Sequence, residues 1–379
     1  MIIKNILARK IIDSRGEDTI EVLINGQKAS SPSGKSTGKY ETPPYHKSID
    51  WNIKEINGLK TSLEFNSFSD LKKLELLIKN KFKLNSPLEF GANALFALES
   101  AILKALAKEQ NKDLWQVINI VAKRLPIPIG NAVGGGLHSK HYQYRTVFQE
   151  FLLIPQEKSF IKNVASIKSN HLLLKKQLSA KFMNDEGAWQ TPLDEEKILQ
   201  ILSKFKKIKI GVDVASSTFY KNSLYNYQDK TLSREEQLDY IIYLQNKYSI
   251  LYLEDSFHEE DFKYFSKISK SKNKLIVGDD LTATHLSRIK KAVQTKAINA
   301  VIIKPNQNGS LLALQEIFNY CKKHKIITIL SHRSGETLDS AIADYAFAFQ
   351  ADYIKCGIAT KWRESKLNRL IEIESSLKK

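Results

Sequence analysis

Short apolar runs that each end in a charged or polar residue recur through the second half of the sequence, and they constrain the fold more than any other feature. A run of this length, bounded by turn residues, is typical of a buried strand. The last five runs begin roughly 25 residues apart, which leaves room for one helix between successive strands. The runs occupy residues 208–214, 250–253, 274–277, 301–303, 326–330 and 353–354.

The residues that end these runs are charged in an order that loop composition does not explain. A surface loop most often begins with Gly, Asn or Ser, whereas acidic ends come first here and basic ends follow. The ends are, in chain order, Asp213, Glu254, Asp279, Lys304, His332-Arg333 and Lys355. In a barrel of strand-helix units the carboxyl ends of the strands meet at one face, where the active site lies. The pattern therefore predicts an α/β fold with a TIM-type barrel and a charged site at that face.

The N-terminal third has a different pattern. Alternating apolar and polar residues over 19–26 predict a hairpin of half-buried strands that turns at Asn25-Gly26. Apolar residues spaced by three and four over 71–82 and 91–114 predict helices. The proline-rich stretch 125–129 (LPIPI) is typical of a linker that leads into a new strand. We therefore expect a smaller α+β domain at residues 1–122 and the barrel domain at residues 123–379.

Composition excludes several classes of protein. Apolar content of 42% and charged content of 26% are typical of a globular protein. No apolar run approaches the roughly 18–20 residues that span a bilayer, and Cys321 and Cys356 are too few for a disulfide framework. The formal charge of +17 comes from scattered lysines with few aromatic residues between them, unlike a nucleic-acid groove. We expect a cytoplasmic protein that binds small anions, with neither a membrane nor a nucleic-acid partner.

Three acidic strand ends predict a metal site. Carboxylates of Asp213, Glu254 and Asp279 on neighbouring strands would form an all-oxygen site that suits Mg²⁺. A zinc site would need His or Cys ligands, and this set has none. Lys304 follows a buried strand, where desolvation would lower its pKa and make it a general base. The alternative is a lysine that ends its strand and extends to water.

Basic groups beside the predicted metal indicate a multiply charged anion as substrate. The guanidinium of Arg333 and the hydroxyl of Ser334 suit phosphate. A metal and a lysine base beside a carboxylate-bearing anion suggest removal of the proton alpha to that carboxylate. An acid would come from the segments that contain Glu150 and Glu186, although these residues alone favour a solvated loop charge in either segment. The loop at 33–38 lacks the spacing of a nucleotide phosphate loop, and it fits either a closing loop or an ordinary turn.

Four motifs carry a resemblance to a known family. They are residues 8–16 (ARKIIDSRG), 33–38 (SGKSTG), 91–94 (GANA) and 331–337 (SHRSGET). In their lengths and order they resemble the enolase family, and the resemblance covers nearly the whole chain. It implies a TIM-type barrel behind an N-terminal domain, and it implies the dehydration of 2-phosphoglycerate to phosphoenolpyruvate and the reverse reaction, in glycolysis and gluconeogenesis.

The resemblance also implies roles for single residues. Lys304 would take the proton from carbon 2, and Glu186, supported by Glu150, would help the hydroxyl on carbon 3 to leave. One Mg²⁺ would be held by Asp213, Glu254 and Asp279, and a second ion would bind during turnover with help from Ser36. The remaining implied positions are Gln149, Arg333, Ser334 and Lys355 for substrate binding, and two catalytic histidines, His138 in a loop and His332 near the acid. The family also implies a homo-oligomer, a dimer or larger.

Departures from the family pattern leave a second interpretation open. The acid segment 184–188 reads NDEGA, Pro305 follows the base, and 360–364 (TKWRE) replaces a motif at the usual subunit contact. A catalytically inactive scaffold that binds RNA or a protein partner through its lysines is the alternative. Retention of every charged residue at the predicted site argues against it, because buried charges without a function cost stability.

Overall fold

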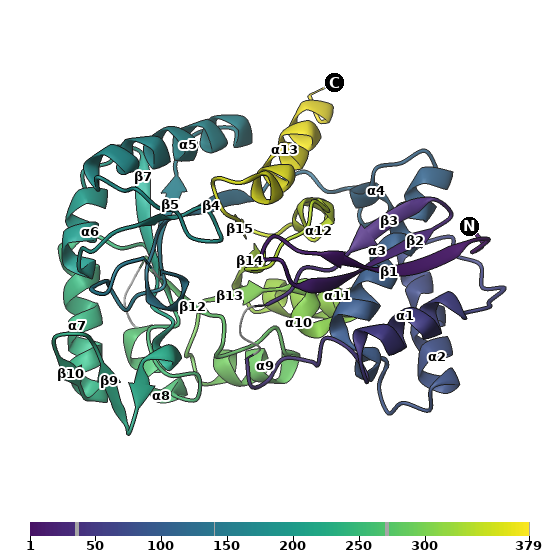
Figure 1. Ribbon diagram of the computed structural model, residues 1–379, viewed down its shortest axis with the longest axis horizontal. Coiled ribbons are helices and arrows are strands. Elements are labelled where there is room, and N and C mark those ends of the chain that lie inside the picture. The colour runs from purple at the N-terminus through teal and green to yellow at the C-terminus, as the bar shows by residue number, and fades with distance from the viewer. Residues whose placement is uncertain (35–37, 140, 270–272, 379) are drawn as a thin grey trace.

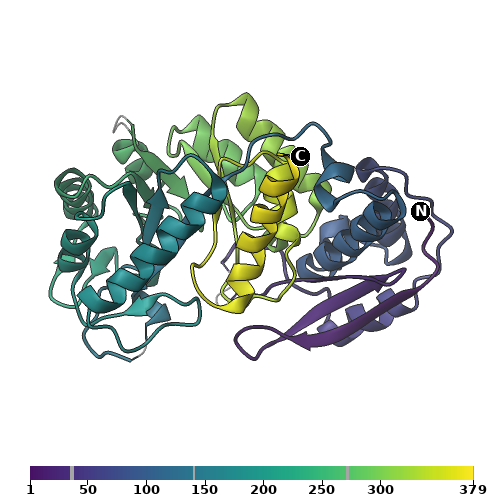
Figure 2. The ribbon, with the colours of Figure 1, turned by 90° about the horizontal axis from the view of Figure 1, so that it is seen from above.

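The computed structural model describes residues 1–34, 38–139, 141–269 and 273–378, apart from the side chain of His138. An N-terminal unit and a barrel lie side by side along the long axis of the molecule (Figure 1). The view from above shows α5 (Phe160–Gln177) and α13 (Lys361–Ser376) next to each other on the outside of the barrel (Figure 2). The barrel and the smaller domain before it confirm the predicted fold class.

The N-terminal sheet has three antiparallel strands in the order β1-β2-β3. They are β1 (Ile6–Ile12), β2 (Asp18–Ile24) and β3 (Gln27–Ser30). The predicted hairpin is confirmed for β2 and β3. Its turn places Asn25 and Gly26 at φ angles of 48° and 80°, which is the left-handed conformation that a two-residue type I′ turn requires. Asn and Gly adopt this conformation at little cost, so the dipeptide sets the register of the hairpin.

Helices of the N-terminal unit pack on this sheet. They are α1 (Ile49–Asn57), α2 (Leu71–Lys81), α3 (Ala92–Glu109) and α4 (Leu114–Ile118), with short 3₁₀ turns at Phe68–Asp70 and Pro87–Phe90. The predicted helix over 91–114 is in fact two helices, because Asn111 turns left-handed at φ 52° and Asp113 begins a new capping box. Helix α3 is buried nearly throughout, since it lies between β2 and β3 on one side and α10 (Pro305–Asn308) of the barrel on the other.

Eight strands close into the barrel through the pairing of β15 with β4. In ring order they are β4 (Ile127–Gly134), β5 (Glu150–Pro155), β7 (Ile208–Asp213), β11 (Tyr252–Glu254), β12 (Leu275–Gly278), β13 (Ala300–Ile303), β14 (Ile327–Ser331) and β15 (Tyr353–Lys355). Strand β5 runs antiparallel to both neighbours, so the ring is not built entirely of parallel strand-helix units. A short strand, β6 (Trp189–Gln190), pairs with β4 outside the ring.

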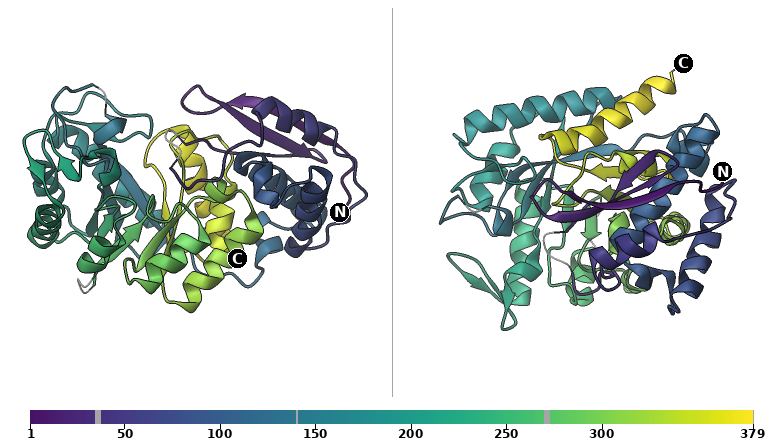
Figure 3. Two further views of the ribbon diagram at one scale, coloured as in Figure 1. Left: turned by 90° about the horizontal axis from the view of Figure 1, so that it is seen from below. Right: turned by 45° about the vertical axis from the view of Figure 1, so that its right-hand side comes forward.

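Helices surround most of the barrel, as the two views of Figure 3 show. Besides α5, α10 and α13 they are α6 (Glu195–Leu202), α7 (Arg234–Lys247), α8 (Phe262–Ile268), α9 (Leu286–Gln294), α11 (Leu311–Lys323) and α12 (Ala341–Ala348). Short 3₁₀ turns lie at Gly136–His138 and Ser216–Thr218. A small sheet of β8 (Tyr220–Lys221), β9 (Leu224–Asn226) and β10 (Thr231–Leu232) projects from the ring. Among the described residues, no helix is both long and apolar enough to cross a bilayer.

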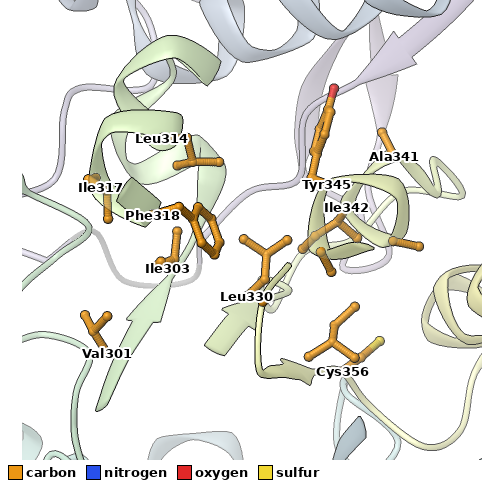
Figure 4. Packing of buried hydrophobic residues seen from close by; sticks show 14 of the residues in the cluster. Val301, Ile303, Leu314, Ile317, Phe318, Leu330, Ala341, Ile342, Tyr345 and Cys356 are labelled. Atoms are coloured by element: carbon orange, nitrogen blue, oxygen red, sulfur yellow. The ribbon is translucent and has the colours of Figure 1, made fainter. Parts of the chain in front are cut away.

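Strand β13 shows why these runs are apolar at every position. Ile302 belongs to the core inside the ring, whereas Val301 and Ile303 belong to the layer between strands and helices. In Figure 4, Ile303 and Leu330 of β14 lie close to Phe318 of α11. A strand covered on both faces needs apolar residues on both, so the alternation of a half-buried strand is lost. The two cysteines are buried free thiols, consistent with a number too small for a disulfide framework.

A buried glutamate at the junction of the two units yields a test of stability. Glu99 of α3 is fully buried, and it accepts a 2.7 Å hydrogen bond from the backbone N–H of Leu311, at the start of α11. Burial, and then the charge of Glu75 on α2, raise the pKa of Glu99 well above its usual value. The folded protein therefore binds this proton more tightly than the unfolded chain. The stability that Glu99 contributes is complete below about pH 4.3 and is lost as the pH rises through the folded pKa.

Glu99→Gln should increase the free energy of unfolding by at least about 1 kcal/mol near pH 8, with a smaller gain near pH 4. Glutamine keeps an oxygen for the Leu311 N–H and has no charge to bury. Urea denaturation at the two pH values measures the difference. Glu316→Gln, at an exposed position of α11, is the control and should change stability equally at both. A larger gain for Glu99→Gln at the acidic pH would contradict the argument.

Candidate active site

A polar cavity lies where one end of the barrel faces the N-terminal unit, and it gathers residues from distant parts of the chain. The strand register explains this convergence. Glu254 pairs with Asp213 on one side and with Val277 on the other, and Ser331 pairs with Lys355. Glu150 begins the reversed strand β5 opposite Asp213, so it lies at the same end of the ring. The predicted positions that line the cavity are Gln149, Glu150, Glu186, Asp213, Asp279, Lys304, His332, Arg333, Ser334 and Lys355.

The ammonium group of Lys355 lies among three carboxylates. Its Nζ atom is 2.8 Å from Glu254, 2.9 Å from Glu150 and 3.2 Å from Asp213. All four side chains are buried. Burial raises the pKa of Asp213 although the charge of Lys355 opposes it, and burial followed by the charge of Asp213 raises the pKa of Glu254 well above its usual value. One lysine thus does not supply enough positive charge to neutralise the three carboxylates that surround it.

Lys304 is paired with Asp279, and the pair corrects one expectation. The lysine Nζ lies 2.5 Å from Asp279 Oδ2. Burial is the largest single effect and lowers the pKa of Lys304, but the nearby carboxylates, Asp279 first and then Asp280, together outweigh it and the net shift is upward. The predicted depression of this pKa is therefore wrong for the protein without ligands. The alternative of an ammonium that extends to water is also wrong, because only 17% of the side chain is exposed.

Glu150 and Glu186 form a second acidic group in the cavity. Both are 3% exposed, so their interpretation as solvated loop charges is wrong. Glu186 Oε2 accepts a 3.1 Å hydrogen bond from the amide of Asn131 on β4. Burial raises the pKa of Glu150 to about 7, an effect that Lys355 opposes and the neighbouring Glu186 increases. This glutamate can therefore hold a proton near neutral pH.

Of the two predicted histidines, the structure places one. His332 is buried, and its Nε2 atom lies 4.0 Å from Glu186 Oε2. Burial, and then the positive charge of Arg363, lower the pKa of His332 well below its usual range, so its imidazole is neutral. The side chain of His138 and the whole of Ser36 lie outside the described residues.

Glu41 is a site residue that the sequence did not reveal. Its carboxylate accepts hydrogen bonds from both terminal nitrogens of Arg333, the shortest of 2.9 Å, and one from the backbone of Gly38. Both charged side chains are buried, at 7% and 5% exposure. Nothing in one sequence distinguishes this glutamate from an ordinary loop charge. The contact fixes Arg333, and it means that an anion must share or replace Glu41 as the partner of this arginine.

The sequence motif at 8–16 supports the loop after β14. Ser14 donates a hydrogen bond to the Ser334 carbonyl at 3.3 Å, and the Arg15 guanidinium donates one to the Ser334 hydroxyl at 3.4 Å. Gly335 pairs with Ser33, and a Cβ atom there would lie 1.9 Å from Asp13 Oδ2, so only glycine fits. The two motifs, more than 300 residues apart, form one structure around Ser334.

Arg363 supports the same loop from the opposite end of the chain. Its side chain is fully buried, and it donates hydrogen bonds to the carbonyls of Ser334 at 2.7 Å and Arg333 at 3.2 Å. The segment 360–364 was expected to bear on a subunit contact, yet this arginine contributes to the site of its own chain.

Asp255, directly after Glu254, is one more carboxylate at this end of the barrel. Its two carboxylate oxygens accept hydrogen bonds from the backbone N–H groups of Asp279 at 3.0 Å and Asp280 at 2.7 Å. Asp255, Asp279 and Asp280 also lie close enough to hold a cation. The backbone bonds already engage both oxygens of Asp255, so we assign it to fixing the end of β12. The better candidates for holding a cation are still Asp213, Glu254 and Asp279.

The charges in the cavity and directly behind it, where Glu254 lies against Lys355, fit a divalent cation. Among the described residues, Glu150, Asp213, Glu254 and Asp279 contact two ammonium groups, so four negative charges face two positive ones when all are ionised. Asp279 Oδ1 is buried and has no hydrogen-bond partner among the described residues. Carboxylate oxygens alone suit a hard cation such as Mg²⁺. The residues present therefore fit the ion that the sequence predicted.

In comparisons with known proteins, the N-terminal unit and the barrel match separate family models. A family model described as "Enolase, N-terminal domain" matches residues 3–118, and one described as "Enolase, C-terminal TIM barrel domain" matches residues 122–379. The chain belongs to the enolase family. Proteins named enolase from Archaeoglobus fulgidus and Thermoplasma acidophilum are each 34% identical to it, over 100% and 99% of this chain and 98% of each relative. The enolase of Ehrlichia ruminantium is 35% identical over 99% of this chain and 96% of the relative.

Membership of the enolase family confirms the resemblance seen in the four motifs, and it makes the chain an enzyme of that family. The match extends over both units, so the departures noted in the sequence are local changes within a complete family fold. Pro305 is one example. It begins helix α10 directly after Lys304, at the first helical position, where proline is well tolerated.

The buried contact between Glu41 and Arg333 can be tested without substrate. Glu41→Gln removes one partner of a buried ion pair, so we expect a loss of about 3 kcal/mol in the free energy of unfolding. Inorganic phosphate should recover part of this loss, because an anion can then occupy the free guanidinium. Thermal unfolding with and without phosphate measures both effects.

Glu21→Gln is the matched control for this prediction. It breaks the 2.6 Å ion pair of Glu21 with Arg9 on the N-terminal sheet, away from the cavity. Phosphate should shift the melting temperature of the control no more than that of the wild type. Equal phosphate shifts for Glu41→Gln and the control would refute the role of Glu41.

Proposed function

We propose that the protein converts 2-phosphoglycerate to phosphoenolpyruvate and water, and catalyses the reverse reaction. One observation carries the proposal. Lys304 follows β13 and Glu150 begins β5, and these strands are four positions apart in a ring of eight. The proposed base and the pair of Glu150 and Glu186 therefore face the cavity from opposite sides. Removing a proton from one carbon and a hydroxyl from the next, on opposite faces of the substrate, requires this arrangement.

The base in this proposal is Lys304. Its Nζ atom would accept the proton from carbon 2, and the electrons of the C–H bond would form the double bond between carbons 2 and 3. Only a neutral amine can accept that proton, and the Asp279 charge opposes neutrality in the unliganded protein. Any ligand that takes up the charge of Asp279 lowers the pKa of Lys304 and prepares it for this step.

The acid in this proposal is Glu186, paired with Glu150. As the bond between carbon 3 and oxygen breaks, Glu186 would donate a proton and the hydroxyl would leave as water. Glu150 has a pKa of about 7, so it can hold a proton beside Glu186 and return one after turnover. Asn131 and His332 lie against Glu186 and would orient its carboxyl group.

Asp213, Glu254 and Asp279 would hold one Mg²⁺, and Ser36 would help to hold a second ion during turnover. When bound, the ions supply positive charge that stabilises the negative charge developing on the substrate carboxylate. Arg333 and Ser334 would bind the phosphate, Lys355 the carboxylate, and Gln149 would contact the substrate beside the acid.

Three further features belong to the same proposal. We propose that residues 1–122 and 123–379 are the two domains, that the protein acts in the cytoplasm, and that it assembles into a dimer or a larger homo-oligomer. Family membership supports all three, and mass measurement in solution would test the last.

Lys304→Ala and Glu186→Gln should each lower kcat for phosphoenolpyruvate formation by at least about 10²- to 10⁴-fold, because each removes a proton-transfer group. Ultraviolet absorbance of the product measures the rate, and EDTA should abolish it until Mg²⁺ is restored. Lys168→Ala is the control. It removes the 2.6 Å ion pair of Lys168 with Glu364 on the outside of the barrel and should keep wild-type activity.

A folded wild-type protein that forms no phosphoenolpyruvate with ample Mg²⁺ would refute the proposal. It would favour the inactive scaffold, for which RNA binding at physiological salt that persists in Lys304→Ala would be the supporting result. Binding that moderate salt removes would show only non-specific attraction to lysines.

A further inference from the structure

Tyr252 lies inside the barrel, directly below the predicted metal site. It is two residues before Glu254 on β11, so the two side chains point to the same side of the strand. The side chain is fully buried. Its neighbours in the inner core are aliphatic residues of other strands, among them Leu152, Val277 and Ile329. Among the eight described residues of that buried core, the Tyr252 hydroxyl is the one polar side-chain group.

Within the described part of the chain that hydroxyl makes one hydrogen bond, and the acceptor is Glu254. The Tyr252 oxygen donates to Glu254 Oε2 at 2.6 Å. Burying a hydroxyl without a partner in an aliphatic core costs free energy. The ring position that makes this bond is therefore strongly favoured over other ring positions. A short bond to an ionised carboxylate is also stronger than a bond between neutral groups.

The neighbouring strand makes room for the ring. Gly211 of β7 pairs with Tyr252, and a Cβ atom at Gly211 would lie 3.1 Å from both Cβ and Cδ1 of the tyrosine. Such a contact is closer than ordinary packing, so a larger residue would displace the ring. A small residue on one strand and a large one opposite it thus fix the hydroxyl under Glu254.

Glu254 has a second donor of a different kind. Lys355 contacts both of its oxygens at 2.8 Å, but the same ammonium also contacts Glu150 and Asp213. Lysine has a long, flexible side chain and serves several carboxylates at once. Tyrosine is neutral and rigid, so it orients the carboxylate and leaves its charge available to a cation.

We propose that Tyr252 is a positioning residue that holds the Glu254 carboxylate in the orientation that binds a divalent cation. The inference rests on the proposed function, because it takes Glu254 as a metal ligand. Partners of this kind behind metal-binding carboxylates typically contribute about 10- to 100-fold to metal affinity. The hydrogen bond acts on the cation through Glu254, so Tyr252 itself contacts neither metal nor substrate.

Tyr252→Phe tests the proposal, because it removes the hydroxyl and keeps the ring. Calorimetric titration of the chelator-treated full chain with Mg²⁺ alone should show affinity about 10- to 100-fold weaker than that of the wild type. In turnover assays the Mg²⁺ concentration for half-maximal rate should rise by a similar factor. The rate at saturating Mg²⁺ should stay close to that of the wild type.

Tyr345→Phe is the matched control. Tyr345 of α12 is also fully buried, and its hydroxyl donates a 2.7 Å hydrogen bond to Ser100, away from the cavity. Its variant should bind Mg²⁺ as the wild type does. Wild-type affinity in Tyr252→Phe, or an equal loss in both variants, would overturn the proposal.

Gly211→Ala is a second probe should Tyr252→Phe fail to fold. The added methyl group pushes the tyrosine ring and should also weaken Mg²⁺ binding, whereas unchanged affinity would overturn the proposal. A wild-type protein that binds no Mg²⁺ contradicts the metal site itself. That result is distinct from a tyrosine substitution that has no effect.

Discussion

Buried carboxylates at one end of the barrel share the positive charge of two lysines, and the rest of the site depends on that imbalance. Glu150, Asp213 and Glu254 surround Lys355, while Asp279 pairs with Lys304. The strand register forces these groups together, because rigid neighbouring strands bring their end residues to one face. Burying these carboxylates costs stability, and additional positive charge would reduce that cost. The apolar frame of the barrel thus stabilises an arrangement of charges that favours binding of a cation.

The barrel and most of the candidate site could be predicted from the sequence because each strand carries its own signal. An apolar run that ends in Asp213 or Lys304 identifies both the strand and the face to which its last side chain belongs. The turn at Asn25-Gly26 was equally predictable, since few dipeptides accept two left-handed residues. These features depend on neighbours in the sequence, which one sequence shows.

Features that depend on contacts between distant segments were not predicted from the sequence. The pKa of Lys304 depends on Asp279 and the other nearby carboxylates, which together outweigh the burial that the sequence implied. Glu41 and Arg363 look like ordinary loop and helix charges until the fold brings them to the loop after β14. The antiparallel direction of β5 could not be predicted either, because a buried strand has the same apolar pattern whichever way it runs. Such properties depend on the folded structure.

The support of the loop after β14 has a consequence for the order of folding. Ser14 near the start of the chain and Arg363 in its last helix both hydrogen-bond to the Ser334 carbonyl. During synthesis the N-terminal unit and all eight barrel strands precede Arg363 out of the ribosome. The loop after β14 therefore acquires its contact with Arg363 only after the barrel strands have been synthesised. A nascent chain can thus hold a nearly finished barrel before this loop receives its hydrogen bonds from Arg363.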